Sequence, residues 1–229
     1  MKKHYLTHFF EPSTIAIIGT GEGSDSIEAK LSERLKEQFK GKVWLVHPRQ
    51  RSLLGGSRHY DTIDQVPGRV DLAIIVTPDS QVNEQLDRCA AVGIDSVVVL
   101  SHLDDRDGFL RNQFVESLRR QADNLGIRMW GPDCYGFVRP ALGIRATLDR
   151  VKSKPGKIAL ISHSGAICRA VTDWAGQSPS VARARLVSFF LVDGEKFPRI
   201  RTREGPFSNK SPLWSFSVSS VQFNSFKFN

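Results

Sequence analysis

The chain has 229 residues, of which 40% are hydrophobic and 24% charged, as expected for a soluble globular protein with more than one full domain. No apolar run approaches the roughly 18 residues that a membrane span requires, and the N-terminus lacks the apolar core of a secretory signal. The net charge of +8 is concentrated in residues 182–229, which hold eight basic and three acidic residues. Because the rest of the chain has no Lys/Arg-rich run, we exclude nucleic acid and membranes as partners.

The three cysteines, Cys89, Cys134 and Cys168, are odd in number and far apart, with no CxxC pair. This pattern is typical neither of a disulfide framework nor of a zinc site. We therefore expect reduced thiols, a cytoplasmic location and no metal site.

Short apolar runs alternate with segments of helical period, as in βαβ units that form a parallel sheet. Strands are predicted at residues 15–19, 43–46, 72–76, 96–100 and 127–130. The predicted helices between them carry apolar stripes made of Ile27, Leu31, Leu35 and Phe39, of Val82, Leu86 and Ala90, and of Leu110, Phe114, Leu118 and Ala122. The fold class is α/β, with a doubly wound parallel sheet in a first domain of residues 1–151.

The polar segment VKSKPGK then predicts a linker, after which KIALISHSGAICRAVTDWA reads as a strand, a tight Ser/Gly turn and a helix. Residues 152–181 are therefore the start of an incomplete second α/β domain. Residues 182–229 show no sustained strand or helix period and form an irregular basic tail. We hypothesise that this tail is an aberrant C-terminus, such as translation past a frameshift.

The first predicted strand ends in GTGEGS, with glycines at positions 19, 21 and 23, and a helix follows. Backbone N–H groups and the helix dipole converge at such a turn and favour an anion. The second strand runs into His47, Pro48, Arg49, Gln50 and Arg51, where an NAD site would have a carboxylate. The arginines suit a ribose phosphate, as in NADP or coenzyme A. A plain tight turn with solvated arginines remains the alternative, and His47 is expected to be a surface or loop residue.

The segments FFEPSTIAIIG, VHPR, DLAIIVTP, GIRMWGPDCYG and GKIALISHSGAICRAVTDWA resemble the CoA-binding half of the NDP-forming acyl-CoA synthetases, which are similar to the succinyl-CoA synthetase α subunit. The resemblance covers residues 9–176 in unbroken order, and GPDCYG followed by SHSGA is its most specific part. It implies a Rossmann-like CoA-binding domain followed by a flavodoxin-like domain, with coenzyme A or acyl-CoA as the ligand.

The resemblance also implies site residues, with the ligand diphosphate on the first turn and the ribose phosphate near the arginines. It places coenzyme A on Gly19, Thr20, Gly21, Glu22, Gly23, Ser24, Arg49, Gln50, Arg51, Val76, Thr77, Pro78, Ser101, His102, Asp133 and Cys134, and phosphate on a second turn of Ser162, Ser164 and Gly165. The family usually has Asn where this chain has Asp133, which puts thioester handling in doubt. Cys134 fits either a position near the CoA thiol or a buried structural role.

Complete relatives convert acyl-CoA, NDP and phosphate into acid, CoA and NTP through a phosphohistidine and an ATP-grasp domain or subunit. This sequence contains neither the histidine loop nor an ATP-grasp region, so the resemblance implies a CoA-binding module that is inactive alone and has no catalytic residue. One alternative is the regulatory synthetase-like region of a bacterial protein lysine acetyltransferase, whose acetyltransferase domain would be the missing partner. Another is an NADP-dependent oxidoreductase, which explains Arg49 but not GPDCYG or SHSGA.

Overall fold

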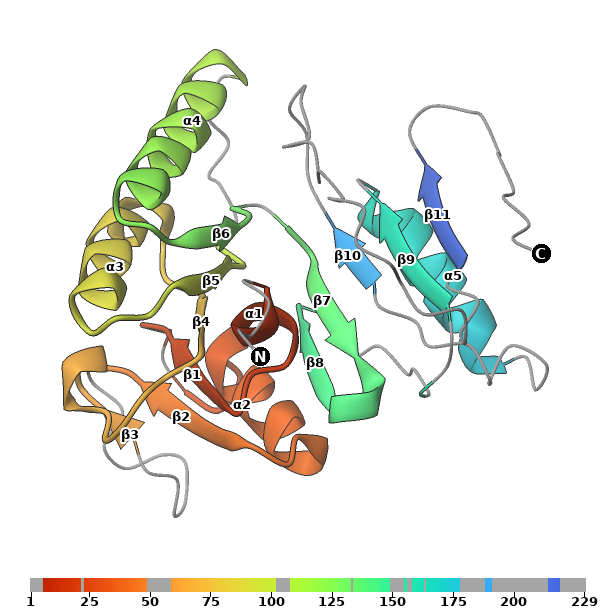
Figure 1. Cartoon of the computed structure of the whole chain (residues 1–229), viewed down its shortest axis with the longest axis horizontal. Helices are drawn as coiled ribbons and strands as arrows, with labels where there is room; N and C mark the ends of the chain where they lie inside the picture. Colours follow the sequence, from red (N-terminus) through yellow and green to blue (C-terminus); the bar gives the residue numbers. More distant parts are fainter. Residues whose placement is uncertain are drawn as a thin grey trace, which may run out of the picture.

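A computed structural model describes residues 6–21, 23–48, 59–101, 108–132, 134–148, 155, 158–162, 164–177, 188–190 and 214–218 (Figure 1). The helices are α1 (Thr7–Phe10), α2 (Ile27–Gln38), α3 (Asp79–Ala91), α4 (Gly108–Asn124) and α5 (Gly165–Gln177), with 3₁₀ turns η1 (Ile63–Gln65) and η2 (Pro140–Leu142). The strands are β1 (Thr14–Ile18), β2 (Lys42–Val46), β3 (His59–Tyr60), β4 (Leu72–Ile75), β5 (Ser96–Val99), β6 (Arg128–Trp130), β7 (Gly136–Arg139), β8 (Ile144–Thr147), β9 (Ile158–Ser162), β10 (Ser188–Phe190) and β11 (Trp214–Val218). None of the described helices combines the length and apolar character needed to cross a bilayer.

The first sheet has six parallel strands in the order β3-β2-β1-β4-β5-β6. The strand order reverses between β1 and β4, because the chain builds outward through β2 and β3 and then returns to the other side of β1. This arrangement confirms the doubly wound α/β fold. Each of the five predicted strands lies within one residue of an observed strand, while the two-residue β3 was not predicted.

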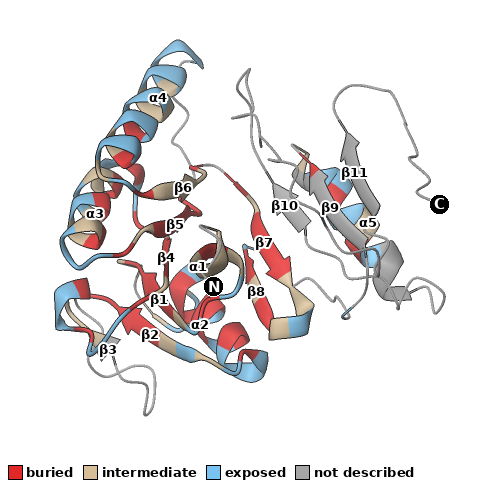
Figure 2. Ribbon diagram, viewed as in Figure 1, coloured by how far each residue is buried: buried red, intermediate tan, exposed pale blue. Residues whose placement is uncertain are grey.

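Both faces of this sheet are covered, as its continuous apolar strands require. On β1, Ala16 and Ile18 belong to the cluster that includes Val82 of α3 and Leu118 of α4. Ile15 and Ile17 face the opposite way, toward a cluster that contains side chains of α1, α2, β7 and β8. Figure 2 shows buried residues concentrated along β1, β4 and β5.

The predicted stripe of α3 is correct, and those of α2 and α4 are correct except at their first members. Leu31, Leu35 and Leu118 are fully buried, whereas Ile27 is 48% exposed and Leu110 53% exposed. Ile27 and Leu110 lie in the first turns of α2 and α4. The two apolar stripes therefore begin one turn later than predicted.

The second sheet has the order β11-β9-β10-β7-β8. Strand β9 and helix α5 confirm the predicted strand, turn and helix of the second unit. The antiparallel hairpin of β7 and β8 was not predicted, nor were β10 and β11, which both pair parallel with β9. Residues 188–190 and 214–218, which lie within the predicted irregular tail, are strands in the structure. The sheet joins strands from both sides of the predicted boundary at residue 151.

Two glycines of the GPDCYG segment are required by the backbone itself. Gly131 and Gly136 have φ angles of +95° and +96°, which L side chains rarely adopt. A Cβ on Gly131 would lie 2.2 Å from the Val99 carbonyl oxygen, and one on Gly136 would lie 1.8 Å from that of Ala146. The glycines of this motif thus have a packing role that is independent of any ligand.

Candidate functional site

The predicted site residues that the structure describes in the first unit lie mainly where parallel strands end, next to the reversal of strand order. Backbone hydrogen bonds join the ends of four neighbouring strands: Gly19 N donates to Val46 O at 3.1 Å, Val76 N to Ile18 O at 2.8 Å, and Leu100 N to Ile75 O at 2.8 Å. The turns after β1 and β4 and the residues after β5 therefore share one edge of the sheet. Open α/β sheets bind their ligands outside this edge, at the switch point.

The turn after β1 is held by a buried carboxylate from the first turn of α2. Gly21 N donates to Glu28 Oε1 at 2.5 Å, and the Glu28 side chain is only 2% exposed. His47, which follows β2, donates from Nε2 to the Gly21 carbonyl oxygen at 2.7 Å and lies 3.5 Å from Glu28 Oε1. His47 was expected to be a surface or loop residue; it lies just after β2 outside any strand or helix, but its side chain is fully buried.

Two of the three glycines in this turn make room for Glu28. A Cβ on Gly19 would lie 2.6 Å from Glu28 Cδ, and one on Gly21 would lie 3.0 Å from Glu28 Oε1. Gly23 is needed for another reason, because its φ is +85°. The glycines suggested that a phosphate approaches the backbone of this turn closely. In the structure the group that approaches it is the Glu28 side chain.

Neither Glu28 nor His47 was identified from the sequence as a site residue. Glu28 precedes Leu31 by three positions and Leu35 by seven, so it continues the apolar face of α2. A carboxylate at such a position must find hydrogen-bond donors when it is buried. The position of Glu28 on the apolar face of α2 was therefore the signal by which the sequence could have identified it.

The turns after β4 and β5 meet through Thr77 and Ser101. Ser101 Oγ donates a hydrogen bond to the Thr77 carbonyl oxygen, and both side chains are buried. Thr77 is 1% exposed, yet its Oγ1 has no hydrogen-bond partner among the described residues. A buried hydroxyl without a partner costs free energy, so this atom is a candidate contact for a ligand.

The other predicted residues of the first unit divide into three groups. Thr20 and Val76 are half-buried, while Ser24 and Pro78 are exposed at the edge. Cys134 packs in the core, and its Sγ donates to Val99 O at 3.3 Å. Burial raises the pKa of the Cys134 thiol to about 12, which favours a structural role in this state. Glu22, Arg49, Gln50, Arg51, His102 and Asp133 lie outside the described residues.

The second predicted turn joins β9 to α5 and is closed by serine hydroxyls. Ser164 N donates to Ser162 Oγ at 3.0 Å, and Ile167 N donates to Ser164 Oγ at 3.3 Å. Gly165 is the first residue of α5, so the three predicted residues lie together at a helix N-terminus. Burial raises the pKa of the nearby Cys168 thiol to about 12, against the opposing effect of a hydrogen bond with Ser162.

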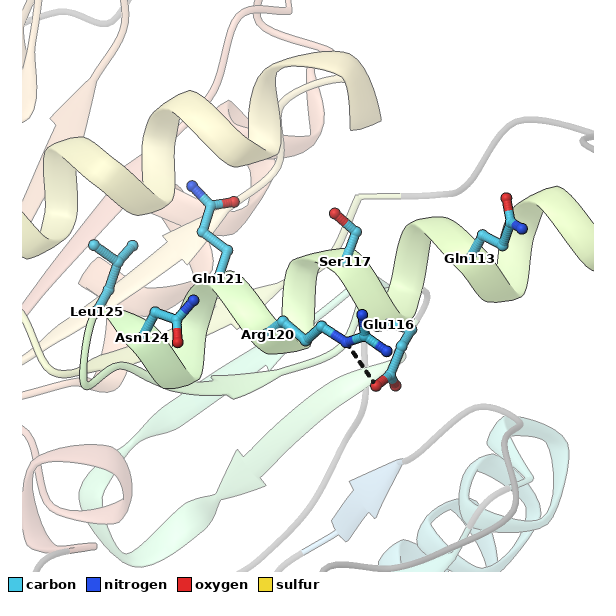
Figure 3. Close-up of a pocket in the computed structure, with 7 residues that line it drawn as sticks. All are labelled: Gln113, Glu116, Ser117, Arg120, Gln121, Asn124 and Leu125. Carbon is cyan, nitrogen blue, oxygen red and sulfur yellow. Dashed lines mark hydrogen bonds and ion pairs between the residues drawn. The ribbon is translucent and has the colours of Figure 1, made fainter.

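A hollow of about 640 Å³ lies elsewhere, on α4 (Figure 3). It is lined by Gln113, Glu116, Ser117, Arg120, Gln121, Asn124 and Leu125. All seven residues belong to α4 or follow it directly, and Arg120 is paired with Glu116 at 3.3 Å. This hollow includes none of the predicted site residues. Within the described part of the chain, no three His, Cys, Asp or Glu side chains are grouped to hold a metal ion.

Residues 13–140 match the model of the CoA binding domain family. The chain belongs to this family. It is 30% identical over 183 residues to the acetate–CoA ligase [ADP-forming] I of Archaeoglobus fulgidus, covering 80% of this chain and 26% of the relative. It is 33% identical to the acetate–CoA ligase [ADP-forming] II subunit alpha of Pyrococcus furiosus, covering 71% of this chain and 35% of the relative.

The apo structure of the dinucleotide-forming acetyl-coenzyme A synthetase 1 from Ca. Korarchaeum cryptofilum is also similar. It superposes with a TM-score of 0.68 at 27% identity and covers 82% of this chain and 40% of that chain. These similarities confirm that the homologous regions are CoA-binding parts of NDP-forming acyl-CoA synthetases. The chain spans 26% and 35% of the two curated relatives described above.

Proposed function

We propose that this chain binds coenzyme A or acyl-CoA along the edge formed by the ends of β1, β4 and β5, as the CoA-binding part of an NDP-forming acyl-CoA synthetase. The proposal rests on one observation: the first turn and the buried Thr77 hydroxyl, which has no hydrogen-bond partner among the described residues, both lie at the reversal of strand order. Both lie within residues 13–140, the stretch that matches the family. The names of the relatives support the same ligand.

In this proposal the diphosphate of the ligand lies at the turn of Gly19, Thr20, Gly21, Glu22, Gly23 and Ser24, next to the N-terminus of α2. Arg49, Gln50 and Arg51 contact the 3′-phosphate. Val76, Thr77, Pro78, Ser101 and His102 line the remainder of the crevice, and the segment of Asp133 and Cys134 lies toward the thiol end. The hydroxyl of Thr77 would gain from the ligand the hydrogen bond that it lacks in the described part of the chain.

The second turn has a different proposed role. Its two serine hydroxyls and the first helical turn of α5 would hold a phosphoryl group during transfer. The complete ligase reaction then needs a partner subunit or domain of the ATP-grasp type. One relative is named as an alpha subunit, which supports a partner of this kind.

The ligand is tested by comparing CoA, dephospho-CoA and NADP in thermal unfolding and calorimetry. A ligand at 100 times its dissociation constant adds about 2.7 kcal/mol to the stability of the folded state. We expect CoA to protect more than dephospho-CoA, and NADP to protect little. Stronger protection by NADP would instead favour an oxidoreductase and overturn the proposal.

The ribose-phosphate contact is tested by replacing Arg49 and Arg51 with Ala. The double variant should bind CoA and dephospho-CoA equally, because the charge-assisted hydrogen bonds to the 3′-phosphate are lost. Arg119 and Arg120 are exposed on α4 and provide the matched control, since replacing both removes the same charge away from the crevice. Unchanged discrimination in the Arg49/Arg51 variant would remove both arginines from the site.

The Thr77 contact is tested by Thr77→Val, which removes a hydroxyl at nearly constant volume. We expect weaker CoA binding with unchanged or higher stability, because the hydroxyl is unpartnered among the described residues. Thr172→Val is the matched control: Thr172 Oγ1 donates to Cys168 O at 2.6 Å, so its loss should cost about 1 kcal/mol of stability and leave CoA binding unchanged. Full CoA affinity in Thr77→Val would exclude the contact.

A further inference from the structure

The proposed function does not explain why a carboxylate is buried at the turn that would take the diphosphate. Glu28 lies on the same face of α2 as the buried Leu31 and Leu35. Its Oε1 atom accepts the hydrogen bond of Gly21 N at 2.5 Å. The turn therefore already holds an anion, and that anion belongs to the chain.

The packing around Glu28 leaves little space for a second anion. The Cβ positions at Gly19 and Gly21 would lie 2.6 Å and 3.0 Å from atoms of its carboxyl group, so the carboxylate is pressed against the backbone of the turn. His47, which follows β2, contacts the same turn, with Nε2 3.5 Å from Glu28 Oε1, and thereby positions the carboxylate. A phosphate placed beside this group would be repelled, because the Glu28 carboxylate is shielded from water.

We propose that Glu28 determines the ligand specificity of the first turn by occupying the place of a ligand phosphate. A ligand diphosphate can then accept the hydrogen bond of Gly21 N only by displacing the Glu28 carboxylate. This inference rests on the proposed binding of CoA at that turn. Glu28 weakens the binding of every ligand that brings a diphosphate to the turn. Ligands that reach only the other parts of the crevice bind without this penalty.

The test is calorimetric titration of the wild-type chain and of Glu28→Gln with three probes: CoA, inorganic pyrophosphate and adenosine 3′-phosphate. Glutamine keeps the shape of the side chain and removes its charge. We expect CoA and pyrophosphate to bind about tenfold more tightly to Glu28→Gln, because one repulsive charge is removed. Adenosine 3′-phosphate, which has no diphosphate, should bind both proteins equally.

Glu33→Gln is the matched control, because Glu33 is exposed on the same helix and its replacement changes the net charge equally. Its affinities should stay within about twofold of the wild-type values, as expected for a screened surface charge. Equal affinity of Glu28→Gln and wild type for CoA and pyrophosphate would overturn the inference and leave CoA binding intact. No CoA binding by any of the three proteins would overturn the proposed function and the inference together.

A measurement on the wild-type chain covers the case in which Glu28→Gln does not fold. In NMR spectra, CoA should shift both the Glu28 carboxyl carbon and the Gly21 amide, because the amide exchanges a carboxylate for a phosphate. Saturating CoA that leaves both resonances unmoved would overturn the inference.

Discussion

The two strand-turn-helix units of the chain close their turns with different chemistry. In the first, the Gly21 N–H is bound by a buried carboxylate that comes from within α2. In the second, the Ser164 N–H is bound by the neutral hydroxyl of Ser162, and no carboxylate bonds to that turn among the described residues. A neutral hydroxyl can yield its place to an anion without charge repulsion, whereas a carboxylate must be displaced. Two similar turns therefore need not be equally ready to bind phosphate.

Disrupting the packing of the first turn should have the largest effect on the stability of the fold. Gly19→Ala should destabilise the fold by about 2–3 kcal/mol, because its Cβ would overlap the carboxyl group of Glu28. Urea unfolding measures this loss of stability. In the double variant Gly19→Ala/Glu28→Ala the clash is absent, so the two substitutions should be coupled by about 1 kcal/mol or more.

Gly68→Ala provides the control for backbone strain alone. Gly68 has a φ of +84° and open space around the position of a Cβ. Its replacement should cost about 1 kcal/mol, whether or not Glu28 is present. Additive effects of Gly19→Ala and Glu28→Ala would contradict the packing that we assign to the first turn.

The buried thiols of the two units should make the unfolding free energy depend on pH. Burial raises the pKa of Cys89, Cys134 and Cys168 from 9.0 to about 12. Above pH 9 the unfolded chain loses these protons while the folded chain keeps them, so the stability contribution present below pH 9 is lost as the pH rises toward 12. The unfolding free energy should therefore fall as the pH rises through this window, with each buried thiol adding to the slope.

Urea unfolding between pH 8 and pH 11 measures this slope, and replacing Cys89 by Ala should reduce it by the share of one thiol. Alkylation gives a second readout. At pH 8 none of the three thiols should react with iodoacetamide in the folded chain, and all should react in urea. Rapid alkylation of Cys134 in the folded chain would contradict its place in the core.

The smallest effect concerns the second turn. Ser164→Ala should cost about 1 kcal/mol, because it removes the hydroxyl that accepts the Ile167 N–H at the start of α5. Ser26→Ala is the equivalent change in the first unit, where Ser26 Oγ accepts from Ala29 N at 3.3 Å. Thermal unfolding with inorganic phosphate sharpens the comparison: Ser164→Ala should lose phosphate protection and Ser26→Ala should retain it. Equal phosphate protection in both variants would contradict the proposed role of the second turn.

The sequence predicts the parallel sheet well because strands buried on both faces appear as continuous apolar runs. It does not predict β7 and β8, whose hairpin includes the end of GPDCYG, a segment that was interpreted only as a ligand motif. The two residues of β3 and the three of β10 are too short to show a period. Ile27 and Leu110, the first stripe members of α2 and α4, are exposed, which an apolar stripe alone does not reveal.

The site is predicted less completely, because a polar residue on an apolar face can be buried or can mark the end of that face. The glycines of the first turn indicated close approach correctly, but the group that approaches is Glu28. His47 was expected to be a surface or loop residue, yet its side chain is fully buried and donates a hydrogen bond to the Gly21 carbonyl oxygen. Thr77 was named only through the resemblance, and its lack of a partner is visible only in the folded chain.

A crystal structure of the chain soaked with coenzyme A would show whether the ligand reaches the first turn. We predict the diphosphate within hydrogen-bond distance of Gly21 N, with Glu28 displaced from it and Thr77 Oγ1 bonded to the ligand. An empty crevice at saturating CoA, with Glu28 still bonded to Gly21, would contradict the account.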